Sequence, residues 1–416
     1  MATKSKTFSR TKTRTFSKTH PWITFRLDLS KADYNLWLKL GDAQARCHYL
    51  SGVPLMPSIA QHLYQVFVAK GVLGTTAIEG NTLSEDEVIR LLEGTLELPP
   101  SKEYLKQEID NIVDACNMIA DEIQGEETAD LDVATILKFN EQVLKSLPLD
   151  EDVEPGRIRS HDVGVGSYPG APHQDCDYLL HRLVDWLGQD FLPTEGNTIV
   201  FGLLKAIMAH LYIAWIHPFG DGNGRTARLM EFQILLSSGV PATAAHLLSN
   251  HYNQTRTEYY RRLDEASKSG GDPIPFIRYA LQGLIDGLEE QLEIIRAQQL
   301  DVHWVNYIHD QFRDKDRATS HRRRRLAIDL SHEPEPIPVS KVRHITPRIA
   351  EAYADRSDKT VSRDIDHLAK MNLVVKSREG VRVNRELMRA FLPPIRIVEK
   401  AHNNSLERTG DSAEEG

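Results

Sequence analysis

Hydrophobic residues recur every three or four positions along most of the chain, which is the pattern of helices with one buried face. This spacing predicts a mainly α fold. The predicted helices cover 57–70, 109–123, 133–147, 177–191, 197–216 and 225–238, with a longer one around 281–295. Ser84 followed by Glu87 has the form of a capping box, so a short helix is expected to begin there.

Two stretches break the helical spacing. Glycine and proline are frequent over 148–172, which predicts a long loop, and its centre at 162–166 is expected to form a short hairpin. Apolar and polar residues alternate over 373–383, which predicts a strand pair that turns at 378–380. Because short helices precede this pair, we expect a small module near the C-terminal end.

The composition narrows the class of protein. The chain has 416 residues, 50 Lys and Arg against 59 Asp and Glu, and a formal net charge of −9. This balance excludes a uniformly basic protein that coats nucleic acid, although it leaves room for a local basic patch. The three cysteines lie far apart without a C-x-x-C pair, which argues against a disulfide framework or a zinc ribbon and favours the reducing cytoplasm.

The most apolar stretch of the chain covers 199–216 and is long enough to raise the question of a membrane. It contains Lys205 and His210, which are costly in lipid. We therefore expect a buried core helix and no membrane partner. Residues 1–20 are rich in Ser, Thr, Lys and Arg and lack an apolar centre, so they are expected to be a disordered basic tail rather than a secretion signal. A transit peptide, which has a similar composition, is the alternative.

One segment stands out chemically. Residues 217–228 read HPFGDGNGRTAR and lie between two apolar helices. Gly222 and Gly224 allow backbone conformations closed to other residues, so successive N–H groups can meet at the positive end of the following helix. Such a concavity is suited to phosphate groups.

The side chains of this segment add what phosphate chemistry needs. Asp221 can hold Mg²⁺ against phosphate oxygens, and Arg225 and Arg228 are close enough along the helix to reach one polyphosphate. His217 titrates near neutrality and can accept a proton from an incoming hydroxyl. The structural alternative is a glycine-rich turn capped by Asp and buttressed by Arg. The run GDGNG alone does not decide between the two, whereas the complete string favours phosphate chemistry.

At these residues the sequence resembles the Fic family, whose signature is H-P-F-x-[DE]-G-N-G-R-x-x-R, and every fixed position matches. The resemblance of the helical surroundings extends over about two-thirds of the chain, roughly 21–288. It implies a Fic-type helical bundle that transfers AMP from ATP to a Ser, Thr or Tyr hydroxyl of a protein target.

The resemblance also implies a role for each residue of the motif. His217 would be the general base, and Asp221 would hold Mg²⁺. The residues that hold the nucleotide would be Gly222, Asn223, Gly224, Arg225 and Arg228, with Arg228 at the γ-phosphate. Gly222 and Gly224 are both present, which favours a nucleotide in the pose usual for the family.

Two further segments match family features more loosely. Fic proteins carry a hairpin, the flap, that registers the target as an added strand. The candidate flap lies within 163–168 and is built on Val163, Gly164, Val165 and Gly166; an ordinary surface loop is the alternative. The stretch 253–264 resembles the segment that contributes to the nucleobase pocket. Tyr260 is the candidate there, and a core tyrosine is the alternative.

Residues 75–81 read TTAIEGN and match [ST]-x-x-x-E-[GN], the inhibitory motif of self-inhibited Fic proteins. Its place before the catalytic motif matches the class with an N-terminal inhibitory helix. The resemblance implies that Glu79 pairs with Arg228 and so occupies the arginine meant for the γ-phosphate. The alternative is a helix-terminal Glu followed by a Gly-Asn turn.

The C-terminal pattern of helix, turn, helix and strand pair looks like a winged helix. Its second helix would turn Lys359, Thr360 and Arg363 outward, as in DNA recognition. A winged helix used only for packing or protein contacts is the alternative. The basic run 322–325 is either a phosphate-contacting segment or a solvated helix start.

Together these observations predict a self-inhibited, cytoplasmic protein adenylyltransferase that uses ATP and Mg²⁺. The expected parts are a basic tail (1–20), an N-terminal helical region (21–100), the catalytic core (101–290), a helical linker (291–325), a winged helix (326–395) and a disordered tail (396–416). AMP removal or another phosphotransfer on the same scaffold stays open, as does a DNA-binding regulator with a nucleotide-sensing core. Self-modification and a homodimer are also left open.

Overall fold

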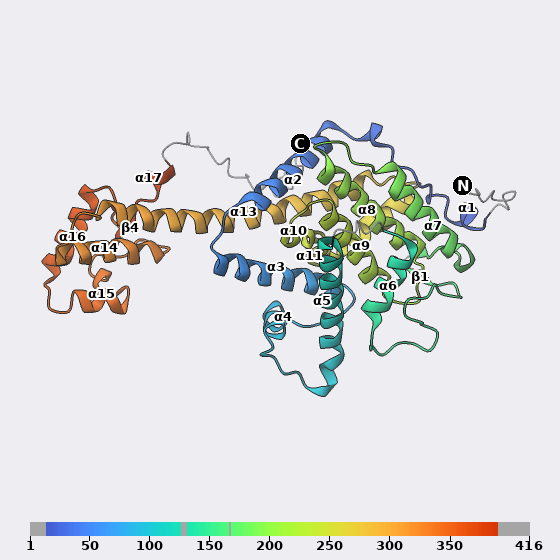
Figure 1. The fold of residues 1–416 in the computed structure, drawn as a ribbon, viewed down its shortest axis with the longest axis horizontal. Coiled ribbons are helices and arrows are strands. Elements are labelled where there is room, and N and C mark those ends of the chain that lie inside the picture. Colours follow the sequence, from blue (N-terminus) through green and yellow to red (C-terminus); the bar gives the residue numbers. More distant parts are fainter. Residues whose placement is uncertain (1–13, 126–130, 166–167, 390–416) are drawn as a thin grey trace, which may run out of the picture. The chain divides into compact units, whose positions relative to one another are not determined.

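The computed structural model describes residues 14–125, 131–165 and 168–389, and it divides into two compact units, Met1–Ile295 and Arg296–Gly416. The helices of the first unit are α1 (Phe16–Thr19), α2 (Tyr34–Gly52), α3 (Pro57–Ala77), α4 (Glu85–Leu92), α5 (Glu103–Gln124), α6 (Val133–Leu144), α7 (His173–Asp190), α8 (Thr198–Ile216), α9 (Asn223–Ser237), α10 (Ala242–Ala245), α11 (Leu247–Gln254) and α12 (Arg256–Lys268). The 38-residue helix α13 (Ile274–Gln311) continues into the second unit. The fold is mainly α, as the sequence predicts (Figure 1).

The core of the first unit forms around α8 and α9, which pack against each other along their lengths. Most side chains of α8 are buried, as expected for the most apolar stretch of the chain. The helix has the length and composition of a membrane span, but 78% of that segment is buried inside the unit. Helices α3, α5 and α6 pack against α9 (Figure 1), so three elements distant in sequence contact the catalytic-motif helix.

Helix α3 is longer than its apolar spacing predicts, and two glycines in the added part let it approach the start of α11 closely. It continues past residue 70 to Ala77. A Cβ built on Gly71 would lie 2.3 Å from Cβ of His246, and one on Gly74 would lie 2.9 Å from the carbonyl oxygen of Ser249. This extension carries the 75–81 motif to the helix end. The capping box of Ser84 and Glu87 is present and starts α4.

The loop before α7 contains the expected hairpin. Strand β1 (Gly164–Val165) pairs antiparallel with β2 (Tyr168–Pro169), with Gly164 opposite Pro169. Gly166, the fourth residue of the candidate flap, lies outside the described residues.

The expectation of a disordered tail over 1–20 is wrong for its last seven residues. Residues 16–19 form α1, and the backbone N–H of Phe16 donates to Oδ2 of Asp175 at 2.8 Å. The His20 side chain is 2% exposed, and its Nε2 lies 2.9 Å from the carbonyl oxygen of Pro169 in β2. Phe16 also packs on the core. This segment is ordered because Phe16 gives it an apolar contact with the core, and because Arg14 and the N–H of Phe16 are partners for the buried carboxylate of Asp175.

The second unit has its own core, to which α13 contributes Trp304 and Ile308, joined by Phe312 directly after the helix end. Trp304 and Ile308 are four positions apart, so they lie on one buried face of the helix. The helical linker expected over 291–325 therefore belongs in part to this core. The other elements of the unit are α14 (Ala318–Asp329), α15 (Pro347–Ala352), α16 (Asp358–Lys370), β3 (Val374–Lys376), β4 (Val381–Val383) and α17 (Glu386–Arg389).

The order α15, turn, α16 and antiparallel β3–β4 pair agrees with the predicted order of elements, and its assignment to the winged-helix class stays a prediction. The basic run 322–325 differs from both expectations, because it lies in the middle of α14. Arg322 and Arg323 pair with Asp364 of α16 at 2.8 and 2.6 Å, and the Asp364 side chain is 2% exposed. Half of the run therefore holds two helices together.

Candidate active site

The motif begins where α8 ends. His217 has φ +51 and Gly222 has φ +77, so the chain turns sharply between α8 and α9. Asn223 closes this turn, since its Oδ1 accepts from the N–H of Phe219 at 3.0 Å and its Nδ2 donates to the Phe219 carbonyl at 2.9 Å. Asn140 of α6 donates to the carbonyl of Asp221 at 2.9 Å. The turn is thus braced from inside and from α6.

Arg159 holds the first residue of the motif, although the sequence analysis does not single it out. Its side chain is completely buried, and its Nε donates to the carbonyl oxygen of His217 at 2.8 Å. Its other nitrogens donate to the carbonyls of His161, at 2.5 Å, and Ala171. One guanidinium therefore ties the motif to both sides of the hairpin loop. A lone Arg in a loop gives no sequence signal of this kind.

His217 is suited to accept a proton at neutral pH. Burial lowers its pKa to about 4, and the backbone of Ala214 and the carboxylates of Glu79 and Asp221 only partly oppose this effect. The imidazole is therefore neutral across the physiological range and has a nitrogen lone pair available.

Asp221 is half exposed at the mouth of the turn. Both of its oxygens lie 3.2 Å from Nη2 of Arg225, and its Oδ1 accepts from the N–H of Gly222 at 2.5 Å. No group of three or more His, Cys, Asp or Glu able to hold a metal occurs among the described residues. A Mg²⁺ ion at Asp221 would take its other ligands from phosphate oxygens and water, which is common for this ion.

Arg228 points its buried guanidinium at the end of α3. Its Nη2 donates to Oε1 of Glu79 at 2.5 Å and to the carbonyl of Thr75 at 2.9 Å. Burial alone would raise the pKa of Glu79, but the charge of Arg228 and this hydrogen bond outweigh burial and lower it. The pair implied by the inhibitory motif is therefore present, with the carboxylate ionised.

Gly224 leaves the space that this carboxylate occupies. A Cβ built on Gly224 would lie 2.1 Å from Oε1 of Glu79 and 3.0 Å from Nη1 of Arg228. The Glu79 carboxylate thus sits directly against the first turn of α9, where the helix dipole and free N–H groups favour an anion. It fills the position that the sequence assigns to a phosphate.

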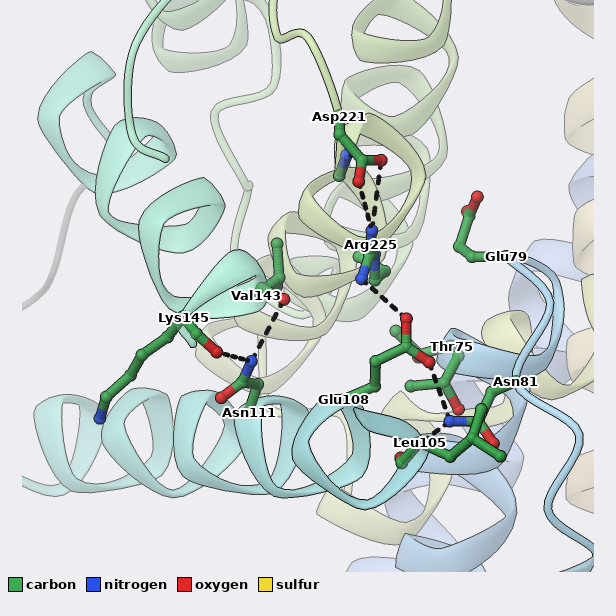
Figure 2. A network of polar contacts seen from close by, with 12 residues as sticks. Thr75, Glu79, Asn81, Leu105, Glu108, Asn111, Val143, Lys145, Asp221 and Arg225 are labelled. Carbon is green, nitrogen blue, oxygen red and sulfur yellow. Dashed lines mark hydrogen bonds and ion pairs between the residues drawn. The ribbon is translucent and has the colours of Figure 1, made fainter. Parts of the chain in front are cut away.

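Arg225 is paired from two sides (Figure 2). Besides Asp221, its Nη1 contacts Oε1 of Glu108 in α5 at 3.2 Å. Oε2 of Glu108 accepts from the side-chain amide of Asn81 at 2.9 Å. Glu108 gives no signal in the sequence, because a carboxylate at the edge of an amphipathic helix resembles any solvated residue.

The remaining candidate residues are dispersed. Tyr260 is 46% exposed, with the guanidinium of Arg256 at 5.9 Å from its ring centre. Its neighbour Tyr259 is buried and hydrogen-bonds to His210 at 2.8 Å. The candidate flap residues Val163 and Gly164 lie beside the motif, since the N–H of Gly170 bonds to the Val163 carbonyl and a Cβ on Gly170 would lie 3.1 Å from Cβ of His217.

The candidate DNA-contacting residues belong to the second unit. Lys359 and Arg363 are exposed on α16, and Thr360 is half-buried. Arg378 and Arg382, on the β3–β4 hairpin, are exposed as well.

Comparison with known proteins identifies the motif region. Residues 130–235 match the family model described as Fic/DOC family. The chain is 34% identical over 209 residues to a protein adenylyltransferase fic-1 of Caenorhabditis briggsae, a match that covers 50% of this chain and 38% of that one. It is 30% identical over 221 residues to a protein adenylyltransferase Fic of Nematostella vectensis, covering 53% and 45%. The chain thus spans less than half the length of these curated relatives.

Two solved structures have a similar fold. Fic-1 of C. elegans (residues 134–508 of that protein) is 25% identical with a TM-score of 0.51, and the match covers 63% of this chain and 73% of that chain. A Fic family protein of Desulfovibrio desulfuricans is 21% identical with a TM-score of 0.51, covering 83% and 91%, which supports the fold alone.

Proposed function

Residues 130–235 form a Fic/DOC domain, and from this premise we propose that the protein is an adenylyltransferase that transfers AMP from ATP to a Ser, Thr or Tyr hydroxyl of a protein target. The observation that carries the proposal is the meeting of a neutral His217, the half-exposed Asp221 and the N-terminus of α9 at one turn. The relatives named protein adenylyltransferase support the same activity.

The proposed step is a displacement at the α-phosphorus of ATP. The target hydroxyl oxygen bonds to this phosphorus and passes its proton to His217, while the bond to the bridging oxygen breaks and pyrophosphate leaves. Free N–H groups at the start of α9, with Arg225 and Arg228, offset the charge of the phosphates. Mg²⁺ held at Asp221 would supply further positive charge to the leaving pyrophosphate.

The conformation in the structure is incompatible with this step, because the Glu79 carboxylate occupies the place proposed for the γ-phosphate. Glu79 contacts Arg228 and lies against Gly224, so the γ-phosphate of ATP would meet a like charge at the arginine meant to hold it. We propose that Glu79 inhibits the enzyme in this way. Displacement of the end of α3 would release Arg228 and open the site.

Intact mass spectrometry after incubation with Mg²⁺ and ATP tests both parts. We expect an adduct of one AMP on the Glu79→Gly protein, little on the wild type, and none on Glu79→Gly/His217→Ala. Self-modification serves here as the readout. An adduct that persists without His217 would contradict the proposed base, and equal labelling of wild type and Glu79→Gly would contradict the inhibition. The reverse reaction, AMP removal, is tested by incubating an AMP-labelled protein with each variant.

A second function is favoured by the charge of the second unit. Lys and Arg outnumber Asp and Glu over 296–389, although the whole chain is acidic. Exposed Lys359 and Arg363 on α16, and Arg378 and Arg382 on the hairpin, would contact DNA phosphates and bases. Loss of duplex binding in Lys359→Ala/Arg363→Ala, measured by fluorescence anisotropy, would support this function. Absence of binding by the wild type would exclude it for the duplex used.

The proposed location is the cytoplasm. Cys47, Cys116 and Cys176 are all free and buried, which suits a reducing compartment. A homodimer stays a prediction, and size-exclusion chromatography with light scattering would test it.

A further inference from the structure

The turn that follows Glu79 is tied down by contacts that do not involve Glu79 itself. Asn81 is 5% exposed, and its side-chain amide donates to the carbonyl of Leu105 and to Oε2 of Glu108, both at 2.9 Å. Its Oδ1 accepts from the N–H of Leu83 at 3.1 Å. Gly80 has φ +111, which suits a sharp turn at this point. Every polar group of the Asn81 side chain is therefore engaged.

Glu108 continues this contact into the catalytic motif. One carboxylate oxygen accepts from Asn81, and the other contacts Nη1 of Arg225 at 3.2 Å (Figure 2). The side chains of Arg225 and Glu108 are only 5% and 15% exposed. Figure 2 shows Asp221, Arg225, Glu108 and Asn81 following one another from α9 to the turn after α3. Each arginine of the motif is thus joined to residues 79–81 by its own route.

The short distance along the chain makes this second route relevant to the first. Asn81 is two residues from Glu79, and two residues span at most roughly 7 Å. When Asn81 is held against α5, the backbone of Glu79 is confined to the neighbourhood of Arg228. When Asn81 is released, Glu79 can leave with the turn. The Asn81 contacts therefore favour the closed arrangement without touching the site where phosphate would bind.

We propose that Asn81 and Glu108 form a second latch, which holds the inhibitory turn closed by anchoring it to α5 and, through Arg225, to the catalytic helix. The inference rests on the proposed inhibition by Glu79. Asn81 and Glu108 are positioning residues that act through Glu79 and Arg225. Activation of the enzyme then requires the release of both arginines, so ATP competes with Glu79 at Arg228 and with Glu108 at Arg225, which Asp221 contacts as well.

The latch is tested by measuring the binding of Mg·ATP by calorimetry. All proteins carry His217→Ala, so that ATP is not consumed during the titration. A hydrogen bond to a charged group is worth about a tenfold change in an equilibrium. Asn81→Ala should therefore raise the affinity for Mg·ATP about tenfold when Glu79 is present. In a Glu79→Gly background the same substitution should change affinity less than about twofold, since the inhibitory carboxylate is already gone.

Glu108 provides the independent leg of the test. Glu108→Ala should raise the affinity for Mg·ATP as much as Asn81→Ala does. The double variant should bind Mg·ATP no more tightly than either single variant. Glu108→Gln keeps an oxygen for the Asn81 amide but gives up the ion pair with Arg225, so its affinity for Mg·ATP should lie between those of the wild type and Glu108→Ala.

A matched control separates a latch from general loosening of the fold. Asn111 is a buried residue of α5, the helix that also carries Glu108, and its side-chain amide donates to the carbonyls of Val143 and Lys145. Asn111→Ala should lower the free energy of unfolding without raising affinity for Mg·ATP.

The results that overturn the latch are distinct from the failure of the proposed inhibition. No gain from Asn81→Ala beside a clear gain from Glu79→Gly would overturn the latch alone, as would an equal gain from Asn81→Ala in both backgrounds. If Glu79→Gly does not raise the affinity for Mg·ATP, both the proposed inhibition and the latch are overturned. That comparison uses only the proteins with and without Glu79, both of which keep Asn81.

Discussion

Arg228 and Glu79 are 149 residues apart in the chain, yet Nη2 of one lies 2.5 Å from Oε1 of the other. The guanidinium side chain is 1% exposed and the carboxylate 30% exposed. A buried arginine therefore depends on a partly exposed residue at the end of another helix. Under the proposed inhibition, this one ion pair would both stabilise the fold and block the site.

Removal of the Glu79 carboxylate should destabilise the protein. Among the described residues, Arg228 would keep only the Thr75 carbonyl as a hydrogen-bond partner. We therefore expect Glu79→Ala to lower the free energy of unfolding by about 1–3 kcal/mol, less than for a fully buried pair because Glu79 is partly solvated. Urea denaturation measures the change. Glu122→Ala breaks a surface pair with Lys138 and should cost less than about 0.5 kcal/mol.

Mg·ATP should reverse this loss selectively. Phosphates replace the missing carboxylate at Arg228, so the melting temperature of Glu79→Ala should rise more with Mg·ATP than that of the wild type. An equal rise in the two proteins, measured by differential scanning fluorimetry, would argue against competition between Glu79 and nucleotide.

The activity of the Glu79→Gly protein should change little with pH, both above pH 7 and at moderately acidic pH. The pKa of His217 is lowered to about 4 by burial, so the neutral base persists as the pH falls through 6.5, the usual value for histidine. The negative charge of Glu79 raises the pKa of His217. The Glu79→Gly variant lacks this charge, so His217 should stay neutral down to a lower pH than in the wild type. We expect kcat/KM for ATP to be flat from pH 6 to pH 8. A midpoint of loss near 6.5, with the fold intact by circular dichroism, would contradict a buried base.

Stability should decrease in acid through a second histidine. Burial lowers the pKa of His246 to about 4, so the folded state disfavours its protonation. Because the folded pKa lies below the unfolded one, stability is complete above pH 6.5 and is lost as the pH falls toward 4, by roughly 3 kcal/mol for this group. His246→Phe keeps the stacking on Phe232 and should flatten the dependence of unfolding free energy on pH over that range. An unchanged slope would assign the acid sensitivity to other groups.

Arg159 should prove essential for the geometry of the motif. Arg159→Lys cannot donate to all three carbonyls in the same directions, so we expect a loss of about 2–4 kcal/mol in stability and at least tenfold in the activity of the Glu79→Gly protein. Arg157→Lys, two residues away with a 76% exposed side chain, is the matched control and should change neither quantity.

Local sequence patterns were enough to predict the helical class and the 217–228 motif, and the family resemblance added Glu79 as the partner carboxylate. Helical spacing and the Ser84 capping box are local, so most predicted helices lie within a few residues of their ranges, whereas α3 and α13 extend well beyond theirs. The signature from His217 to Arg228 is contiguous, because phosphate binding at a helix N-terminus needs residues of one turn. The Glu79 pair was implied by a second short motif.

The other residues that support that site became visible only in the folded chain. Arg159, Asn140, Glu108 and Asn81 come from separate segments, and each acts through a hydrogen bond or ion pair that depends on the packing of α3, α5 and α6 around α9. The docking of residues 14–20, which spacing alone presents as a polar tail, depends likewise on the buried carboxylate of Asp175. Periodicity records which face of a helix is buried, whereas a buried polar contact requires two distant segments to meet, and no local pattern encodes that meeting.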